Sequence, residues 1–398
     1  MWRLSAARTL AWALLLGGWV GLGSIVQALA WGPLPAFAMI AVWLLALGAG
    51  AALIGWLRLP RPGLQALLLF ATIVAGRAIH VALHGGGLLA MLPALLAWAM
   101  AVALASAAVR RCRVASRVAS RMAGRVAGHR RARPPVAAAA AGALLAWACA
   151  GDVTHLNALG PRLIGGLLMA CGLLIALMPR GLPADADADA DAHAHAHAAT
   201  TGGCQAGLFD CSLPSWHASE WRDPQHWPVR LASLAMLPMM CGLPWMVSLC
   251  RSDAVTPQAV LGVHFAAMFV PALWVSNRPA LNRIAAPACA ALLALGAMLL
   301  VAAPGASAWW ALALAHGAAW SVAWSANLGE RGAAKRPGTS ALTGAVLNAL
   351  LVLALGLAMA EAGLPALGGW HIVLGLAGAL AGLAMVIGRG LAMLAAGT

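Results

Sequence analysis

The chain has 398 residues, of which 63% are hydrophobic and only 9% are charged, whereas about 25% are charged in an ordinary soluble domain. Its apolar residues form continuous runs of about 20 residues, which excludes a soluble domain and a β-barrel and predicts an all-α polytopic membrane protein. The net charge is +14. Because the basic residues alternate with the apolar runs, the positive-inside rule explains this charge, and no nucleic-acid partner is expected.

The apolar runs predict about twelve transmembrane helices. The first six lie near 10–30, 35–57, 64–83, 87–109, 136–151 and 160–178. The second six lie near 229–250, 257–276, 284–303, 307–327, 340–361 and 369–395. Arg3 and Arg8 before the first run resemble the start of a signal peptide, but the many later spans favour an uncleaved first helix.

The loops between these spans alternate in charge. Arginine or lysine follows every second span, and the intervening loops are poor in basic residues, with Arg251 as the exception. With twelve spans, all the basic loops share one side, which the positive-inside rule identifies as the cytoplasm. The sequence therefore predicts a multi-pass protein of the bacterial inner (cytoplasmic) membrane with both termini in the cytoplasm.

The same pattern divides the chain into two halves. Residues 1–179 form an N-terminal six-helix half, 180–228 a cytoplasmic linker, and 229–398 a C-terminal six-helix half. The N-terminal half contains a basic cytoplasmic segment, 110–135, whose arginines recur at i, i+4 intervals. This segment is predicted to form a basic helix on the cytoplasmic leaflet, where anionic membrane lipid attracts it.

The linker contains the alternating sequence DADADADAHAHAHA at 185–198. Alternation with alanine cannot build a core, so no packed structure is expected. His193, His195 and His197 are candidates for loose metal binding on the cytoplasmic side. The alternative is a tolerated linker produced by replication slippage in a repetitive gene.

Two neighbouring apolar runs carry a candidate metal site. Met236 and Met240 are spaced i, i+4 in the predicted seventh helix, and His264 and Met268 have the same spacing in the eighth. That spacing places each pair on one face, and the loop positions place all four residues within roughly 3 Å in depth, near the bilayer midplane. Thioether and imidazole donors together suit copper, above all Cu(I). Cys241, beside Met240, is a further candidate ligand.

Methionine packing is the alternative for this site, because the chain has 16 methionines. Five histidines are expected near the outer face, either as an external metal-loading site or as interfacial residues. They are His80, His84, His155, His316 and His371.

The sequence shows no phosphate-binding loop and no catalytic triad, so no enzyme and no organic cofactor is expected. No carboxylate falls clearly within a span. A proton relay would therefore have to use His264, or transport is not coupled to protons.

The overall organisation resembles the major facilitator superfamily, in which two six-helix halves form a parallel repeat. Two loops strengthen the resemblance, although both are degenerate and lack the aspartate usual in that superfamily. The sequence GWLRLPRPG, with Gly55, Arg58 and Arg61, lies between the second and third spans. The sequence NRPALNR, with Arg278 and Arg283, lies between the eighth and ninth.

The MxxxM and HxxxM motifs in the seventh and eighth spans resemble those of the CcoA-type copper importers within that superfamily. The resemblance implies import of copper, as transported substrate, into the cytoplasm for assembly of cbb3-type cytochrome oxidase. It implies copper binding by Met236, Met240, His264 and Met268, and a cytoplasmic copper chaperone as a partner. Two alternatives stay open: a carrier for another metal or an organic substrate, and a non-transporting membrane accessory such as an assembly factor or sensor.

Overall fold

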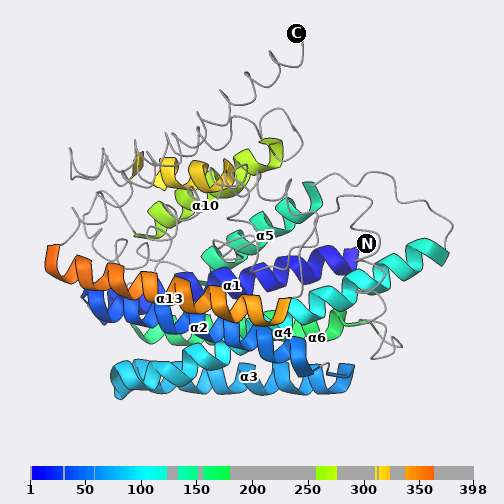
Figure 1. Ribbon diagram of the computed structural model, residues 1–398, viewed down its shortest axis with the longest axis horizontal. Helices are drawn as coiled ribbons and strands as arrows, with labels where there is room; N and C mark the ends of the chain where they lie inside the picture. The colour runs from blue at the N-terminus through cyan, green and yellow to red at the C-terminus, as the bar shows by residue number, and fades with distance from the viewer. Residues whose placement is uncertain are drawn as a thin grey trace, which may run out of the picture.

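The computed structural model describes residues 2–29, 32–57, 59–122, 133–150, 156–179, 257–275, 310–311, 313–322 and 337–362. All regular structure in these ranges is helical, as the sequence predicted. The N-terminal half comprises α1 (Trp2–Ala28), α2 (Pro33–Leu57), α3 (Arg61–Val81), the π-helical turn η1 (Ala82–Gly86), α4 (Gly87–Met122), α5 (Arg133–Ala150) and α6 (Leu156–Leu177). The C-terminal half includes α10 (Pro257–Val275) and α13 (Pro337–Ala362), shown in Figure 1, and the helical residues 310–311 and 313–322.

Within the described residues, six helices are long and apolar enough to cross a membrane, namely α1, α2, α3, α4, α6 and α13. Two shorter apolar stretches, Val136–Ala148 and Ala259–Leu273, lie in α5 and α10. Each of these helices coincides with a predicted span. The spans predicted at 229–250, 284–303 and 369–395, and the linker at 180–228, lie outside the described residues.

The fourth span differs from the prediction in length. Helix α4 runs for 36 residues without a break, roughly 54 Å, whereas the hydrocarbon core of a bilayer is about 30 Å thick. No glycine or proline occurs between residues 94 and 122, so nothing in the sequence ends the helix at the expected position. The described part of the basic segment, 110–122, therefore continues the span (Figure 1) and does not form a separate helix on the leaflet.

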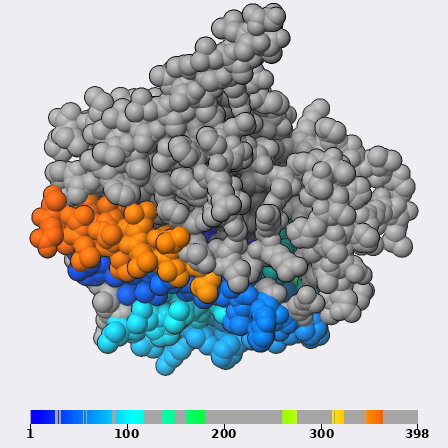
Figure 2. Space-filling model, viewed as in Figure 1, coloured from blue at the N-terminus to red at the C-terminus, as the bar shows by residue number. Residues whose placement is uncertain are grey.

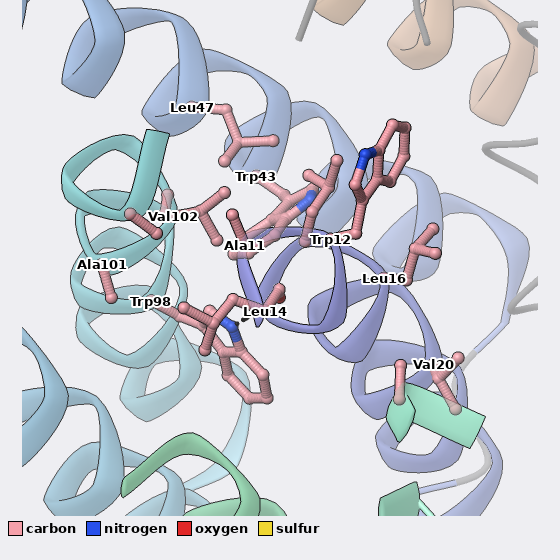
Figure 3. Close-up of a cluster of buried hydrophobic side chains, with 14 of the residues drawn as sticks. Ala11, Trp12, Leu14, Leu16, Val20, Trp43, Leu47, Trp98, Ala101 and Val102 are labelled. Atoms are coloured by element: carbon pink, nitrogen blue, oxygen red, sulfur yellow. Dashed lines mark hydrogen bonds between the residues drawn. The ribbon is translucent and has the colours of Figure 1, made fainter. Parts of the chain in front are cut away.

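Two tryptophans form the centre of the N-terminal half. Trp43 of α2 and Trp98 of α4 meet edge to face, with ring centres 6.4 Å apart and planes at 85°. The indole N–H of Trp98 donates to the carbonyl oxygen of Leu14 in α1 at 3.0 Å (Figure 3). A Cβ atom on Gly18 would lie 2.4 Å from the Trp43 ring, so glycine allows α1 to approach it. These contacts fix α1, α2 and α4 together.

Helix α3 lies at the edge of the described bundle (Figures 1 and 2). It exposes large apolar side chains, namely Leu67, Leu69, Phe70 and Ile73, as expected for a surface that faces lipid. Its buried Thr72 hydroxyl donates to the carbonyl oxygen of Leu68 at 2.7 Å, so this polar group is satisfied within its own helix.

Two side-chain hydrogen bonds to backbone carbonyls connect α3 and the loop before it to α4 and α6. The Arg111 guanidinium of α4 donates to the carbonyl oxygen of Leu59, directly before α3. The Gln65 amide of α3 donates to the carbonyl oxygen of Ile175 in α6 at 3.2 Å. Leu59, within the sequence GWLRLPRPG, therefore contacts α4, and the first turns of α3 contact the C-terminal end of α6.

Among the described residues, two of the helix pairs that connect the N-terminal and C-terminal halves approach closely at a glycine. Helix α13 packs against α2, where a Cβ on Gly356 would lie 2.6 Å from the Phe37 Cβ, and the two helices lie side by side in Figure 2. Helix α10 packs against α5, where a Cβ on Gly262 would lie 3.2 Å from the Trp147 ring nitrogen. Glycine permits the close approach in both cases, as is common between membrane helices.

A similar close approach joins α1 and α5 and gives a stability prediction. A Cβ on Gly142 would lie 2.5 Å from the Trp12 Cβ and 2.6 Å from the Thr9 carbonyl oxygen. We expect Gly142→Ala to lower the free energy of unfolding by about 1–3 kcal/mol, because two backbones must separate. Gly165→Ala in α6 is the control, since its Cβ would meet nothing within 4 Å. Thermal unfolding in detergent measures both, and equal melting temperatures would contradict the packing.

Candidate metal site

Helix α10 buries His264 and Met268 one helical turn apart, and both side chains are 0% exposed. His264 lies seven residues after the start of α10 and Met268 lies seven residues before its end, so both are within about 3 Å of the middle of the helix. The i, i+4 spacing therefore puts an imidazole and a thioether on the buried face of one helix. Their role as metal ligands stays a prediction.

The helical residues 313–322 cross α10 at Gly317. A Cβ there would lie 2.6 Å from both the Ala267 Cβ and the His264 carbonyl oxygen, and 3.1 Å from the Met268 nitrogen. Only glycine allows two helices to come this close, because any side chain would meet backbone atoms. The crossing brings His316, the residue before Gly317, against α10.

The rings of His264 and His316 stack, with centres 5.0 Å apart and planes 17° apart. The His264 Nδ1 lies 3.2 Å from the carbonyl oxygen of Ala313. Because a carbonyl oxygen can only accept, the Nδ1 carries the hydrogen, and the Nε2 of the neutral ring has a free lone pair. This Nε2 is buried, and no hydrogen-bond partner for it exists among the described residues.

An aromatic cluster lies beside this pair. Phe269, next to Met268, meets Trp320 edge to face at 5.4 Å and Trp12 edge to face at 6.2 Å. Because Trp12 belongs to α1, the site lies where the N-terminal half touches the C-terminal half. Large apolar rings lower the polarity of these surroundings, and a low local dielectric strengthens a metal–ligand or charge interaction.

The polar side chains buried in the described ranges are few and uncharged. The buried polar side chains in the described ranges are Thr72, Ser106, His264, His316, Ser321 and Asn348. None of these is a carboxylate, the ligand on which Ca²⁺ and Mg²⁺ sites usually depend. Imidazole nitrogen and thioether sulfur, in contrast, suit copper.

The structure places the other predicted site residues as follows. His80 and His84 lie together at the junction of α3 and η1, exposed, with ring centres 4.2 Å apart, and the His84 Nδ1–H donates to the His80 carbonyl oxygen at 2.8 Å. In the part of the chain that is described, no three His, Cys, Asp or Glu side chains gather as a metal group. The remaining predicted residues lie outside the described ranges: Met236, Met240, Cys241, His155, His193, His195, His197 and His371.

The expected placement of His316 with the outer-face histidines is wrong. It is only 2% exposed and stacks on His264. The sequence does contain the signal for this position. His316 lies about ten residues inside the short loop near 304–306, and His264 about eight residues inside the loop near 251–256, so their depths agree within roughly 3 Å.

The comparisons with known proteins concern the fold. No protein-family profile matches the sequence. No curated protein is significantly similar to it. Several solved transporter structures, however, superpose over almost the whole chain.

The human organic anion transporter MFSD10 (TETRAN) is 14% identical, with 96% of this chain and 97% of that chain covered and a TM-score of 0.51. A POT family transporter in complex with a thioalcohol-conjugated peptide is 11% identical, with 97% and 95% covered and a TM-score of 0.57. A double-tryptophan variant of XylE is 15% identical, with 96% and 94% covered and a TM-score of 0.55. The chain therefore has the major facilitator fold that the sequence predicted, as a multi-pass helical membrane protein.

Proposed function

We propose that the protein is a secondary transporter that imports copper through the bacterial inner membrane into the cytoplasm, where the copper supplies assembly of cbb3-type cytochrome oxidase. The observation that carries this proposal is the buried His264, whose Nε2 lone pair is unused in the middle of α10 beside the buried Met268. A buried nitrogen without a partner is unfavourable by about 1–3 kcal/mol. An ionisable side chain in the interior of a membrane protein is by default a candidate for substrate or ion binding, which a serine hydroxyl is not.

The proposed ligands are Met236, Met240, His264 and Met268, with Cys241 as an additional candidate. The Nδ1–H bond from His264 to the Ala313 carbonyl supports this role, because metal-bound histidines usually donate their second ring nitrogen to a backbone carbonyl or carboxylate. This bond fixes the tautomer and the ring orientation before the metal arrives. Copper is then the transported substrate, and a cytoplasmic copper chaperone would receive it.

The mechanism is alternating access about this site. Two six-helix halves of a major-facilitator fold rock against each other around a binding site near the bilayer midplane. Here α1 touches α10 through Trp12 and Phe269, directly beside Met268. Rocking of the halves would open and close this aromatic contact, and so expose the metal to one side at a time.

Two alternatives predict different results. The solved neighbours include transporters described for organic anions, peptides and nucleosides, so an organic substrate is the first alternative. Against it, no charged side chain is buried in the described ranges to bind a carboxylate or phosphate. The second alternative is a non-transporting accessory, which would leave the rate of copper uptake unchanged when deleted.

Single substitutions of the three methionines test the proposal. We expect Met236→Leu, Met240→Leu and Met268→Leu each to lower copper accumulation by at least about tenfold, because leucine keeps the volume but removes the sulfur donor. Accumulation of radioactive copper and cbb3 oxidase activity are measured in cells. Met169→Leu is the control, since this methionine of α6 is exposed on the surface of the bundle. Normal values for all three variants would overturn the ligand assignment.

A further inference from the structure

The stacked pair of buried histidines points to a ligand that the MxxxM and HxxxM motifs do not contain. We propose that His316 is a direct copper ligand, so that His264 and His316 bind one copper ion together with the Met268 thioether. This inference rests on the proposed copper function, and it specifies the donor set of that site: two imidazoles and at least one sulfur.

Burial and contact are the first support. His316 is 2% exposed and His264 and Met268 are 0% exposed, although imidazole is polar and rarely enters a membrane interior without a role. The stacking brings two ring systems from different helices to 5.0 Å between centres. Because a metal–imidazole bond is about 2.0–2.1 Å, one ion joins nitrogens up to about 4 Å apart. The ring planes are only 17° apart, so the in-plane lone pairs do not converge in this stack, and a shared ion requires the His316 ring to turn toward the His264 Nε2.

The tautomer of His264 is the second support. Its Nδ1 is occupied by the Ala313 carbonyl, and Ala313 is three residues before His316 in the same helical segment. The hydrogen bond therefore links the backbone that carries His316 to the ring of His264. It leaves the His264 Nε2, buried and without a hydrogen-bond partner in the described ranges, as the donor atom available to a metal.

The packing at Gly317 is the third support. Glycine allows the segment 313–322 to contact the α10 backbone at His264 and Met268, so the two imidazoles and the thioether come from two helices held at a fixed distance. A site built across a rigid helix pair keeps its geometry better than one on a loop. Two imidazoles and a thioether match the donors found around copper, whereas alkaline-earth ions require oxygen ligands.

The experiment measures Cu(I) binding by the purified full-length protein in detergent. Affinity is obtained by competition with a coloured Cu(I) chelator, and X-ray absorption counts the imidazoles bound to copper. For the wild type we expect one ion bound through two imidazoles. For His316→Ala we expect at least about tenfold weaker binding and a single imidazole. His316→Gln, which keeps a polar side chain of similar length, should behave in the same way.

Ser321→Ala is the matched control, because Ser321 is a buried polar residue of the same helical segment but offers no preferred copper donor. It should bind Cu(I) as the wild type does. Melting temperatures of all variants are recorded, and if His316→Ala does not fold, the comparison is made with His316→Gln.

The outcomes separate the two proposals. Wild-type affinity and two imidazoles in both His316 variants, with weaker binding in Met268→Leu, would overturn the role of His316 and leave the copper function intact. Absence of Cu(I) binding by the wild type would overturn the copper function and this inference together.

Discussion

Replacement of Gly317 by leucine is expected to abolish copper accumulation, although the glycine itself offers no donor atom. A Cβ at this position would lie 2.6 Å from the His264 carbonyl oxygen and from the Ala267 Cβ. The neighbouring atoms are backbone and a short side chain, which cannot rotate away, so the segment 313–322 must separate from α10. Separation of the two helices by even about 1 Å removes the stacked arrangement of His264 and His316 and lowers activity by about a hundredfold.

The matched control is Gly172→Leu in α6. This change adds the same side chain to a helical glycine, but the Cβ would meet nothing within 4 Å and the residue is exposed on the outside of the bundle. Radioactive copper uptake is measured for both variants, together with the amount of protein in the membrane. Uptake by Gly317→Leu equal to that by Gly172→Leu, at equal protein amounts, would show that the close crossing does not hold the site.

The helices themselves could be predicted from the sequence because lipid leaves few choices. A backbone in the bilayer must satisfy its own hydrogen bonds, so each apolar run of sufficient length becomes a helix. The prediction at 257–276 corresponds to α10, Pro257–Val275, where proline marks the start. The length of α4 was predicted wrongly because hydrophobicity marks only the part of a helix inside the membrane. Beyond the membrane, alanine and arginine favour continued helix, and no glycine or proline ends it before Met122.

The candidate site was predicted only in part. The shared face of His264 and Met268 follows from their spacing on α10, and their burial agrees with it. The stacking of His316 on His264 could not be predicted, because it depends on which helix packs against α10. The chain contains 44 glycines, and nothing in the sequence distinguishes Gly317 as the one at which a helix crosses α10. Comparison of depths along the predicted spans would have suggested His316, but depth alone does not identify neighbours.

The hydrogen bonding of His264 distinguishes a histidine that binds a ligand from one that only packs in the core. If His264 served packing alone, both ring nitrogens should have partners, because an unpaired buried nitrogen opposes folding. The observed ring satisfies one nitrogen through Ala313 and leaves the other without a partner in the described ranges. The aromatic contacts of Phe269 with Trp12 and Trp320 keep the surroundings apolar, which raises the energetic importance of that nitrogen.

We therefore expect His264→Leu to be inactive but at least as stable as the wild type. Leucine has a volume similar to that of histidine and removes the unpaired Nε2, whose burial is unfavourable by about 1–3 kcal/mol. The carbonyl oxygen of Ala313 loses the imidazole donor but lies in a helix, where a backbone N–H one turn later is available to it. Copper accumulation should fall to the level of cells without the protein, while the melting temperature of the purified variant stays unchanged or rises by a few degrees.

Ser321→Ala is the control for His264→Leu, because it removes an unpaired buried polar group without removing a proposed copper ligand. The Ser321 hydroxyl is also buried without a hydrogen-bond partner among the described residues, so its removal should stabilise the protein by the same mechanism. Because serine is not a copper ligand of choice, this variant should still accumulate copper at the wild-type rate. A His264→Leu protein that unfolds at a clearly lower temperature and still accumulates copper would identify His264 as a packing residue, and the metal site would have to be sought elsewhere in the chain.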